Sequence, residues 1–453
     1  MSLQQNHNSH HLFNDVSLWG IFKTSLPMMI SALSSHIMLV LDQLILAYYS
    51  VESMTGATSA FLWSSIIQCI ALSTTMVAGA FVGHYNGTQK YDQSGIPVWQ
   101  MIWFSVSLFV ISIPSSMFLG EYCIPEPLQK EGIPYFQCIL MFAPITGIIY
   151  SISSFFVSIG RGITVTIAAI LSNIFNIVVD IILVFGYFGI DQFQGSMGAA
   201  IGTVISWIVN IFILSCFYFR GDVRQKYGTC NFKFRPSIMK ECLKLGASGG
   251  VGHTFEMVAW SSVYYLLAKI DTSLALIQTM AFDVNICLSF IASGLEKGII
   301  AMTSNFLGSS RSEKIKTLLY KGLTIHLIFA SILFFAFYIY PELITHQFIK
   351  FDVSPETLER AFFVLKLVWI FFVFDGALWV IAGIIEAGGD INFTMWSISG
   401  CLWIFVALPS IILSHFHLLG IEITWCLLIV SAISINILLH LRYRSQKWIK
   451  IKV

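Results

Sequence analysis

Four acidic residues lie deep inside long apolar stretches of the sequence: Asp42, Asp180, Glu256 and Asp375. An ionised side chain in the middle of a membrane span costs about 2.5–3.5 kcal/mol even on the lenient insertion scale. Leucine would pack better at these positions, so the acids are expected to face a cavity and to bind something positive. The candidates are a proton, a metal ion and a cationic solute, which makes a transporter the first hypothesis.

The two acids in the first half of the chain have polar companions at a similar depth. At 1.5 Å per helical residue, Asp42, Asp180 and Thr203 lie roughly 8–10 Å from the outer ends of their stretches. Asn176 precedes Asp180 by four residues, so the two share a helix face. Hard oxygen ligands suit Na⁺, whereas two close carboxylates can instead share a proton. We therefore predict a cation or proton site made of Asp42, Asn176, Asp180 and Thr203, in which the first three are the possible Na⁺ ligands.

A second acidic site is expected in the other half. Glu256 and Asp375 lie deeper, roughly 18 and 21 Å from the outer ends of their stretches. We predict that they bind a cation or the substrate, with Asp283 as a third acid. For Glu296, Lys297 and Lys366, snorkelling or a local ion pair is as good an explanation as a functional role.

Membrane-spanning helices must position these residues. The chain of 453 residues is 56% hydrophobic and 11% charged, whereas soluble domains are about 25% charged. A hydrocarbon core about 30 Å thick requires roughly 20 apolar residues per helix. Twelve such stretches lie near residues 20–47, 57–82, 98–119, 134–159, 163–187, 196–219, 244–268, 275–304, 318–341, 361–385, 391–413 and 418–440. A β-barrel is excluded, because its strands would be alternating segments of about 10 residues.

Lysine and arginine set the expected orientation. With the N-terminus inside, nineteen of these residues fall on one side of the membrane, four fall on the other, and two lie within spans. Positive residues favour the cytoplasmic side, so both termini are expected in the cytoplasm and the chain in the inner (plasma) membrane. The net charge of +1 argues against a nucleic-acid partner.

The twelve stretches divide into two similar halves. The second stretch runs into AFVGHYNGTQKYDQ and the eighth into AMTSNFLGSSRSEK, while the fourth ends in SIGRGITVT and the tenth in EAGGDINFT. An even number of spans gives both halves the same orientation, as in other parallel-repeat transporters. We therefore predict an all-α membrane protein with two six-helix lobes around a central cavity. Its parts are an N lobe (1–219), a basic linker (220–243), a C lobe (244–441) and a basic tail (442–453).

Several of these segments resemble the multidrug and toxic compound extrusion (MATE) transporters. SLPMMISALSSHIMLVLDQLILAYYS is similar to their first helix, and SNIFNIVVDIILVFGYFGI followed by GSMGAAIGTVISWI to their fifth and sixth. TFEMVAW and FDGALWVIAGIIEAGGD resemble helices seven and ten of the NorM-like branch. The resemblance covers the whole chain and places the four embedded acids on acids of that family.

The resemblance implies antiport: export of cationic, amphipathic compounds in exchange for Na⁺ or H⁺, by a monomer that needs no cofactor. Pro27 is a possible hinge of the first helix, because proline removes a helical hydrogen bond. An enzyme is not expected, since HExxH does not occur in the sequence and the match to GxSxG at Gly246–Gly250 lies inside an apolar stretch rather than after a strand. The alternative is a flippase of lipid-linked precursors from the same superfamily, although such a cavity should be lined with Arg and Lys.

Overall fold

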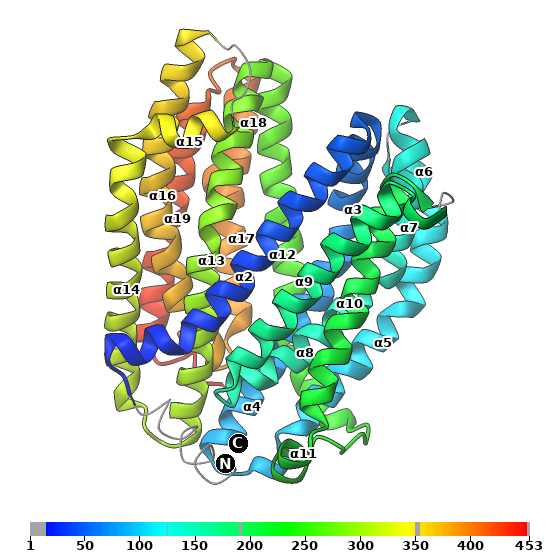
Figure 1. The fold of residues 1–453 in the computed structure, drawn as a ribbon. Coiled ribbons are helices and arrows are strands. Elements are labelled where there is room, and N and C mark those ends of the chain that lie inside the picture. The colour runs from blue at the N-terminus through cyan, green and yellow to red at the C-terminus, as the bar shows by residue number, and fades with distance from the viewer. Residues whose placement is uncertain (1–14, 125, 190–192, 349–353, 451–453) are drawn as a thin grey trace.

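A computed structural model describes residues 15–124, 126–189, 193–348 and 354–450, and these residues are helical without strands (Figure 1). The N-terminal half contains α2 (Leu18–Tyr49), α3 (Val51–Thr75), α4 (Val77–Gly87), α5 (Gly95–Phe118), α6 (Gly120–Cys123), α7 (Gln129–Phe142), α8 (Pro144–Ser158), α9 (Gly162–Val184), α10 (Ser196–Tyr218) and α11 (Gly221–Tyr227). The C-terminal half contains α12 (Pro236–Ile270), α13 (Thr272–Gly308), α14 (Glu313–Tyr338), α15 (Pro341–Phe348), α16 (Pro355–Ala387), α17 (Ile391–Leu402), the π-helical segment η5 (Trp403–Ala407), α18 (Leu408–His415) and α19 (Ile421–Arg444). The ends of the predicted N lobe and tail, residues 1–14 and 451–453, lie outside the described residues.

The helices follow the twelve predicted spans. Ten segments of the described chain are long and apolar enough to cross a membrane, and the bent pair α7 and α8 adds an eleventh. The predicted span 244–268 lies within α12, which is less apolar because it begins in the basic region and carries Glu256. The second span is broken at Met76, between α3 and α4.

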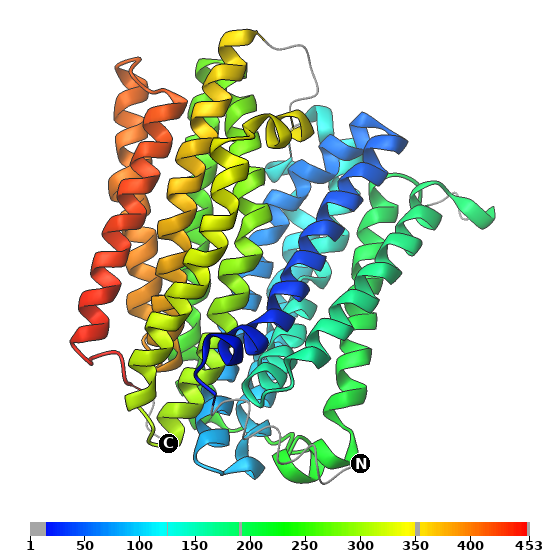
Figure 2. The same ribbon diagram turned by 60° about the vertical axis from the view of Figure 1, so that its left-hand side comes forward.

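Two helix bundles form the molecule. Helices α12–α19 share one large apolar core, to which Ile21 and Met29 of α2 contribute. The largest core of the N-terminal half draws mainly on α4, α5 and α8. The bundles are closest at the lower end of Figure 1 and diverge toward the upper end, with α2 running obliquely between them. In Figure 2, α19 (red) forms the outer edge of the C-terminal bundle.

Glycine residues lie where helices of the two bundles pack against each other. α13 packs on α2 at Gly294 and Gly298, where an added Cβ would clash with Met29 and Ser25. α12 packs on α3 at Gly246, against the backbone of Thr74. Small residues let membrane helices approach closely without relying on a hydrophobic driving force, which the lipid does not supply. The helices of the two lobes therefore pack closely at these glycine residues, where no side chain projects between them.

The backbone repeats itself between the two halves. α4 and α13 both end in glycine and continue into a residue of positive φ, Gln89 (61°) and Ser310 (56°). The residue before α9, Arg161, has φ −107° and ψ 40°, and the residue before α17, Asp390, has φ −100° and ψ 41°. The sequence similarity between the second and eighth spans, and between the fourth and tenth, thus corresponds to repeated local geometry.

Candidate functional site

The acidic pair of the N-terminal half lies between α2 and α9, which pack side by side. The carboxyl groups of Asp42 on α2 and Asp180 on α9 are direct electrostatic neighbours. Asn176 lies one turn before Asp180, and both side chains are completely buried. Of the four residues predicted for this site, the structure therefore brings three together: Asp42 and Asp180 by direct proximity, and Asn176 by its position on the helix of Asp180.

This cluster contains polar atoms without partners. Among the described residues, Oδ1 of Asp42 and both terminal atoms of Asn176 and of Asp180 are buried and accept or donate no hydrogen bond. Buried polar groups are nearly always satisfied, so each exception requires an explanation. A bound cation or a shared proton would supply the missing interactions. The donor set of two carboxylates and one amide oxygen suits Na⁺.

α10 closes the cluster through a glycine. A Cβ added at Gly202 would fall on the Asp180 carboxylate, so the absence of a side chain there makes room for the acid. Thr203 is the next residue of α10 and is buried (8% exposed). The sequence pattern GSMGAAIGT predicts this helix. The role of Gly202 depends on packing between two helices, which the sequence alone does not show.

Tyr135 is a second member of this site that sequence reasoning missed. It lies on α7, close enough to Asp42 and Asp180 for both carboxylates to act on its hydroxyl group. Its ring also contacts three small apolar clusters of the N-terminal half. As one of 16 tyrosines, it carried no distinguishing signal in the sequence.

In the C-terminal half, the predicted acids lie on α12 and α16. Glu256 and Asp375 are electrostatic neighbours, and Trp379 lies beside the Asp375 carboxyl one turn further along α16. Glu256 forms an ion pair with His253 (Oε2 to Nδ1, 3.2 Å) when the histidine is protonated. His253 in turn lies beside Cys69 of α3, so this acidic site reaches the interface between the lobes.

The remaining embedded charges fall into two groups. Glu296 is a further acidic neighbour of Asp375 and lies next to Lys297 on α13. In the described chain, Asp283 is not among the charged neighbours of Asp375. Its carboxylate instead lies near Cys287, one turn away. Lys366 lies over the ring of Tyr338 (5.9 Å), within the C-terminal bundle. Of these residues, the structure places Glu296 closest to the predicted site.

The predicted hinge residue Pro27 lies inside α2, which Figure 1 shows bent in its first part. The carbonyl oxygen of Pro27 accepts a hydrogen bond from the Thr166 hydroxyl of α9. Further along, Nδ2 of Asn173 donates to the hydroxyl of Ser34 (2.9 Å). Two polar contacts thus tie α2 to α9 between Pro27 and the acidic pair.

Where the bundles meet at the lower end of Figure 1, hydrogen bonds cross between them. Nε2 of His84 on α4, in the tautomer that is protonated there, donates to the carbonyl oxygen of Ala387 on α16 (3.2 Å). Nδ2 of Asn305 on α13 donates to the carbonyl oxygen of Ser158 on α8 (2.9 Å). Asn86 also donates to the side-chain oxygen of Asn305. We call these five residues the clasp.

The clasp follows the internal repeat. His84 and Asn305 each lie three residues before the last glycine of their helices, α4 and α13. Their acceptors, Ala387 and Ser158, are the last residues of α16 and α8. Each half therefore extends one side chain to the same backbone position of the other half.

The described residues contain no group of three or more His, Cys, Asp and Glu side chains that could hold a metal ion. No protein-family model matches the chain. The chain is similar to a probable multidrug resistance protein NorM of Mannheimia succiniciproducens (20% identity, 93% of each chain) and to the multidrug export protein MepA of Staphylococcus saprophyticus (25% identity, 91% of each chain).

Solved structures share the fold. A MATE transporter in a bent conformation superposes with a TM-score of 0.83 at 16% identity, over 97% of both chains. The eukaryotic MATE transporter AtDTX14 gives 0.81 at 17% identity, over 95% of this chain and 96% of that one. A MOP superfamily transporter from Pyrococcus furiosus, described as having a binding pocket of reverse polarity, gives 0.78 at 16% identity, over 97% of this chain and 98% of that one.

Proposed function

We propose that the chain is a NorM-like MATE transporter and that it exports organic cations in exchange for Na⁺ or H⁺. The observation that carries this proposal is the buried pair of Asp42 and Asp180 with its unpartnered oxygen atoms. In a membrane interior such atoms are costly unless a cation or proton is bound. Binding of a cation or a proton to these oxygen atoms can therefore be coupled to a change in the conformation of the protein.

The two acidic sites have different proposed roles. The pair in the N-terminal half takes up the coupling ion, for which Asp42, Asn176 and Asp180 supply oxygen atoms. Glu256 and Asp375 attract the organic cation, and the Trp379 ring beside Asp375 adds a cation–π surface. Neutralising the N-terminal pair removes negative charge from the N lobe, which lowers the attraction of the transporter for the cationic compound.

Transport requires the site to open to each side of the membrane in turn. In the orientation we propose, the termini and the clasp face the cytoplasm, and the lobes diverge toward the outside. The described state is then closed inward by the clasp. Exchange to the other state would break the hydrogen bonds of His84 and Asn305, while the glycine contacts let the lobes rock past each other.

Ethidium efflux from reconstituted vesicles tests this proposal. Na⁺ and pH gradients are imposed separately on the wild type, on Asp42→Asn and on Asp180→Asn, with Asp92→Asn as the control. Asp92 is an exposed acid of the same half, in the 3₁₀ turn Tyr91–Gln93. We expect one gradient to drive efflux, both cluster variants to lose it, and the control to retain it. Efflux that survives in both cluster variants would refute the coupling role.

The same fold occurs in a transporter described as having a pocket of reverse polarity, so the embedded charges must decide the class of substrate. Here Asp42, Asp180, Glu256 and Asp375 are acidic, which favours a cation over the pyrophosphate of a lipid-linked precursor. If no gradient drives ethidium efflux from correctly inserted protein, a flippase assay with a fluorescent lipid-linked pyrophosphate becomes the decisive experiment. Movement of that lipid would replace the export proposal.

A further inference from the structure

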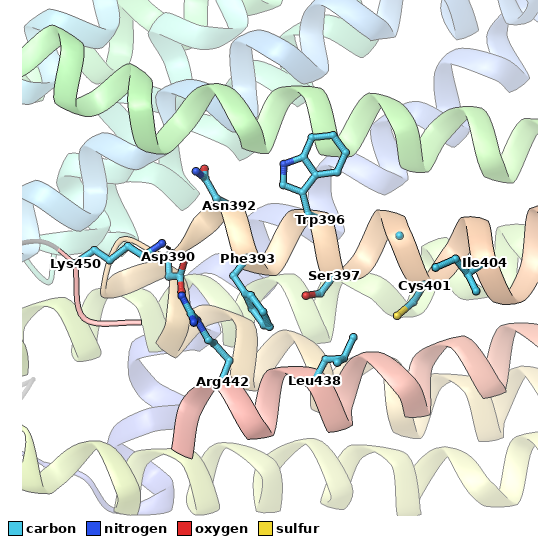
Figure 3. Close-up of a pocket in the computed structure, with 11 residues that line it drawn as sticks. Asp390, Asn392, Phe393, Trp396, Ser397, Cys401, Ile404, Leu438, Arg442 and Lys450 are labelled. Atoms are coloured by element: carbon cyan, nitrogen blue, oxygen red, sulfur yellow. Dashed lines mark hydrogen bonds and ion pairs between the residues drawn. The ribbon is translucent and has the colours of Figure 1, made fainter. Parts of the chain in front are cut away.

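A groove whose lining contains none of the four embedded acids runs between α17 and α19 on the outer flank of the C-terminal bundle (Figure 3). It has a volume of about 530 Å³. Phe393, Trp396, Gly400 and Leu438 line its apolar length, and Arg442 and Lys450 lie at one end. The groove therefore has the polarity of an amphiphile, with a long apolar part and a short charged part.

Packing explains why the groove is open. Gly400 lacks a side chain, and a Cβ built on it would meet nothing within 4 Å. The next turns of the span form the π-helical segment η5, which ends just before Pro409. Trp396 and Leu438 are 51% and 39% exposed. In a membrane-spanning bundle such outward side chains face lipid, so the groove is open to acyl chains.

The charged end has a net positive charge. Asp390 is fully buried and accepts hydrogen bonds from Nε of Arg442 (2.7 Å) and from Nζ of Lys450. Two cations against one acid leave a net charge of +1. Arg442 uses one of its five N–H donors in this bond, and its guanidinium lies 4.8 Å over the ring of Phe393. Lys450 is 40% exposed in its side chain.

We propose that this groove binds an anionic phospholipid of the cytoplasmic leaflet. The lipid phosphate contacts Arg442 and Lys450, and one acyl chain lies along Phe393, Gly400 and Leu438. Basic pockets at the cytoplasmic ends of membrane helices suit anionic headgroups, and the charge complementarity here excludes a cationic ligand. The choice of leaflet rests on the proposed orientation, whereas the class of lipid does not.

The site also contacts Gly388, the residue that follows the clasp residue Ala387. The backbone N–H of Lys450 donates to the carbonyl oxygen of Gly388 (2.7 Å). Trp448 is buried, and a Cβ at Gly388 would clash with it. Gly388 follows Ala387, which accepts the hydrogen bond of His84. A phosphate held by Lys450 would therefore hold the segment after α19 against Gly388, next to the clasp residue Ala387.

Native mass spectrometry of the full, delipidated chain tests the proposal. Dioleoyl phosphatidylglycerol and dioleoyl phosphatidylcholine are titrated separately into the wild type, Gly400→Leu, Lys450→Gln and Lys447→Gln. Leucine at position 400 fills the groove without changing a charge. Lys447 is a matched control, because it is an exposed lysine of the same segment that does not line the groove.

We expect the first phosphatidylglycerol to bind the wild type roughly fivefold more tightly than phosphatidylcholine. Gly400→Leu and Lys450→Gln should lose that preference, and Lys447→Gln should keep it. If Gly400→Leu does not fold, as judged by thermal unfolding, Ser397→Leu blocks the same groove. Equal binding of the two lipids by the wild type, or retained preference in the blocked variant, would overturn the proposal. Binding of inorganic phosphate as tightly as phosphatidylglycerol would show an anion site without an acyl-chain groove, which also overturns it.

Discussion

The two halves of the chain share a backbone plan but surround their buried acids differently. In the N-terminal half, Asp42 and Asp180 form no ion pair with a described residue, and an amide and a tyrosine are their polar neighbours. In the C-terminal half, Glu256 is paired with His253, and the acids lie on three helices near Lys297. A compact, unpaired carboxylate pair favours a small bare cation, whereas a dispersed acidic site beside tryptophan favours a larger organic one.

A second contrast lies at the equivalent positions before α9 and α17, where the sign of the charge is reversed. Arg161 of the N-terminal half pairs with Asp222, which follows α10, and both side chains are partly exposed. Asp390 of the C-terminal half pairs with Arg442 and Lys450 and is completely buried. In each half, the residue before this helix therefore forms an ion pair with residues near the end of the same half, although the signs of the charges differ.

The largest expected effect distinguishes the two acidic sites. Asp180→Asn should abolish gradient-driven efflux of every substrate, because it removes a carboxylate of the proposed site for the coupling ion. Asp375→Asn should weaken transport in a substrate-dependent manner, with a change of about tenfold in apparent affinity for a single cation contact. Efflux kinetics with ethidium and with a zwitterionic substrate would measure both. If both variants lose all substrates equally, the division of roles between the halves is wrong.

The reversed ion pairs predict unequal losses of stability. Asp390→Asn should lower the free energy of unfolding by about 2–3 kcal/mol, below the ~3–5 kcal/mol of a fully buried pair because both cations reach solvent. Arg161→Gln should cost under about 1 kcal/mol, since exposed ion pairs contribute little. Thermal unfolding in detergent, followed by circular dichroism, compares the two variants. Equal shifts in melting temperature would contradict the inferred difference in burial.

The sequence was sufficient for the fold because each span is a long apolar run, and the lipid permits few other structures for such a run. Asp42, Asp180, Glu256 and Asp375 could be proposed from the sequence because charge inside a span is conspicuous. Tyr135 could not be identified from the sequence, because nothing distinguishes it there from any other amphipathic side chain. The clasp was also invisible, since His84 and Asn305 act on backbone carbonyl groups about 150 to 300 residues away in the chain.

Glycine positions give a smaller, steric test of the same comparison. Gly202→Ala places a methyl group on the Asp180 carboxylate, and overpacking of this kind costs about 1–3 kcal/mol. Gly400→Ala meets nothing within 4 Å and should leave both stability and efflux unchanged. Melting temperature and gradient-driven efflux would be measured for both variants. Wild-type behaviour of Gly202→Ala would show that α10 does not pack tightly against the proposed cation site.

The smallest expected effects concern the clasp, where the two halves should respond unequally despite their shared geometry. His84→Ala removes one bond between the halves, worth about 1 kcal/mol. Asn305→Ala removes bonds to Ser158 and Asn86, and also one to Ala301 within its own helix. Hydrogen–deuterium exchange of residues 80–94 and 300–312 should therefore accelerate in both variants, and more strongly in Asn305→Ala.

The control for this measurement is Ser289→Ala, because the Ser289 hydroxyl bonds only to Ile286 O within α13 in the described chain. It should leave exchange at the clasp unchanged. A local loss of helix stability would accelerate exchange in one segment alone, whereas opening of the lobes must accelerate it in both 80–94 and 300–312. The side chain of His84 bonds to Ala387, which lies in neither segment. Faster exchange in 300–312 as well as in 80–94 after His84→Ala is thus the observation that identifies the clasp as a closure between the lobes.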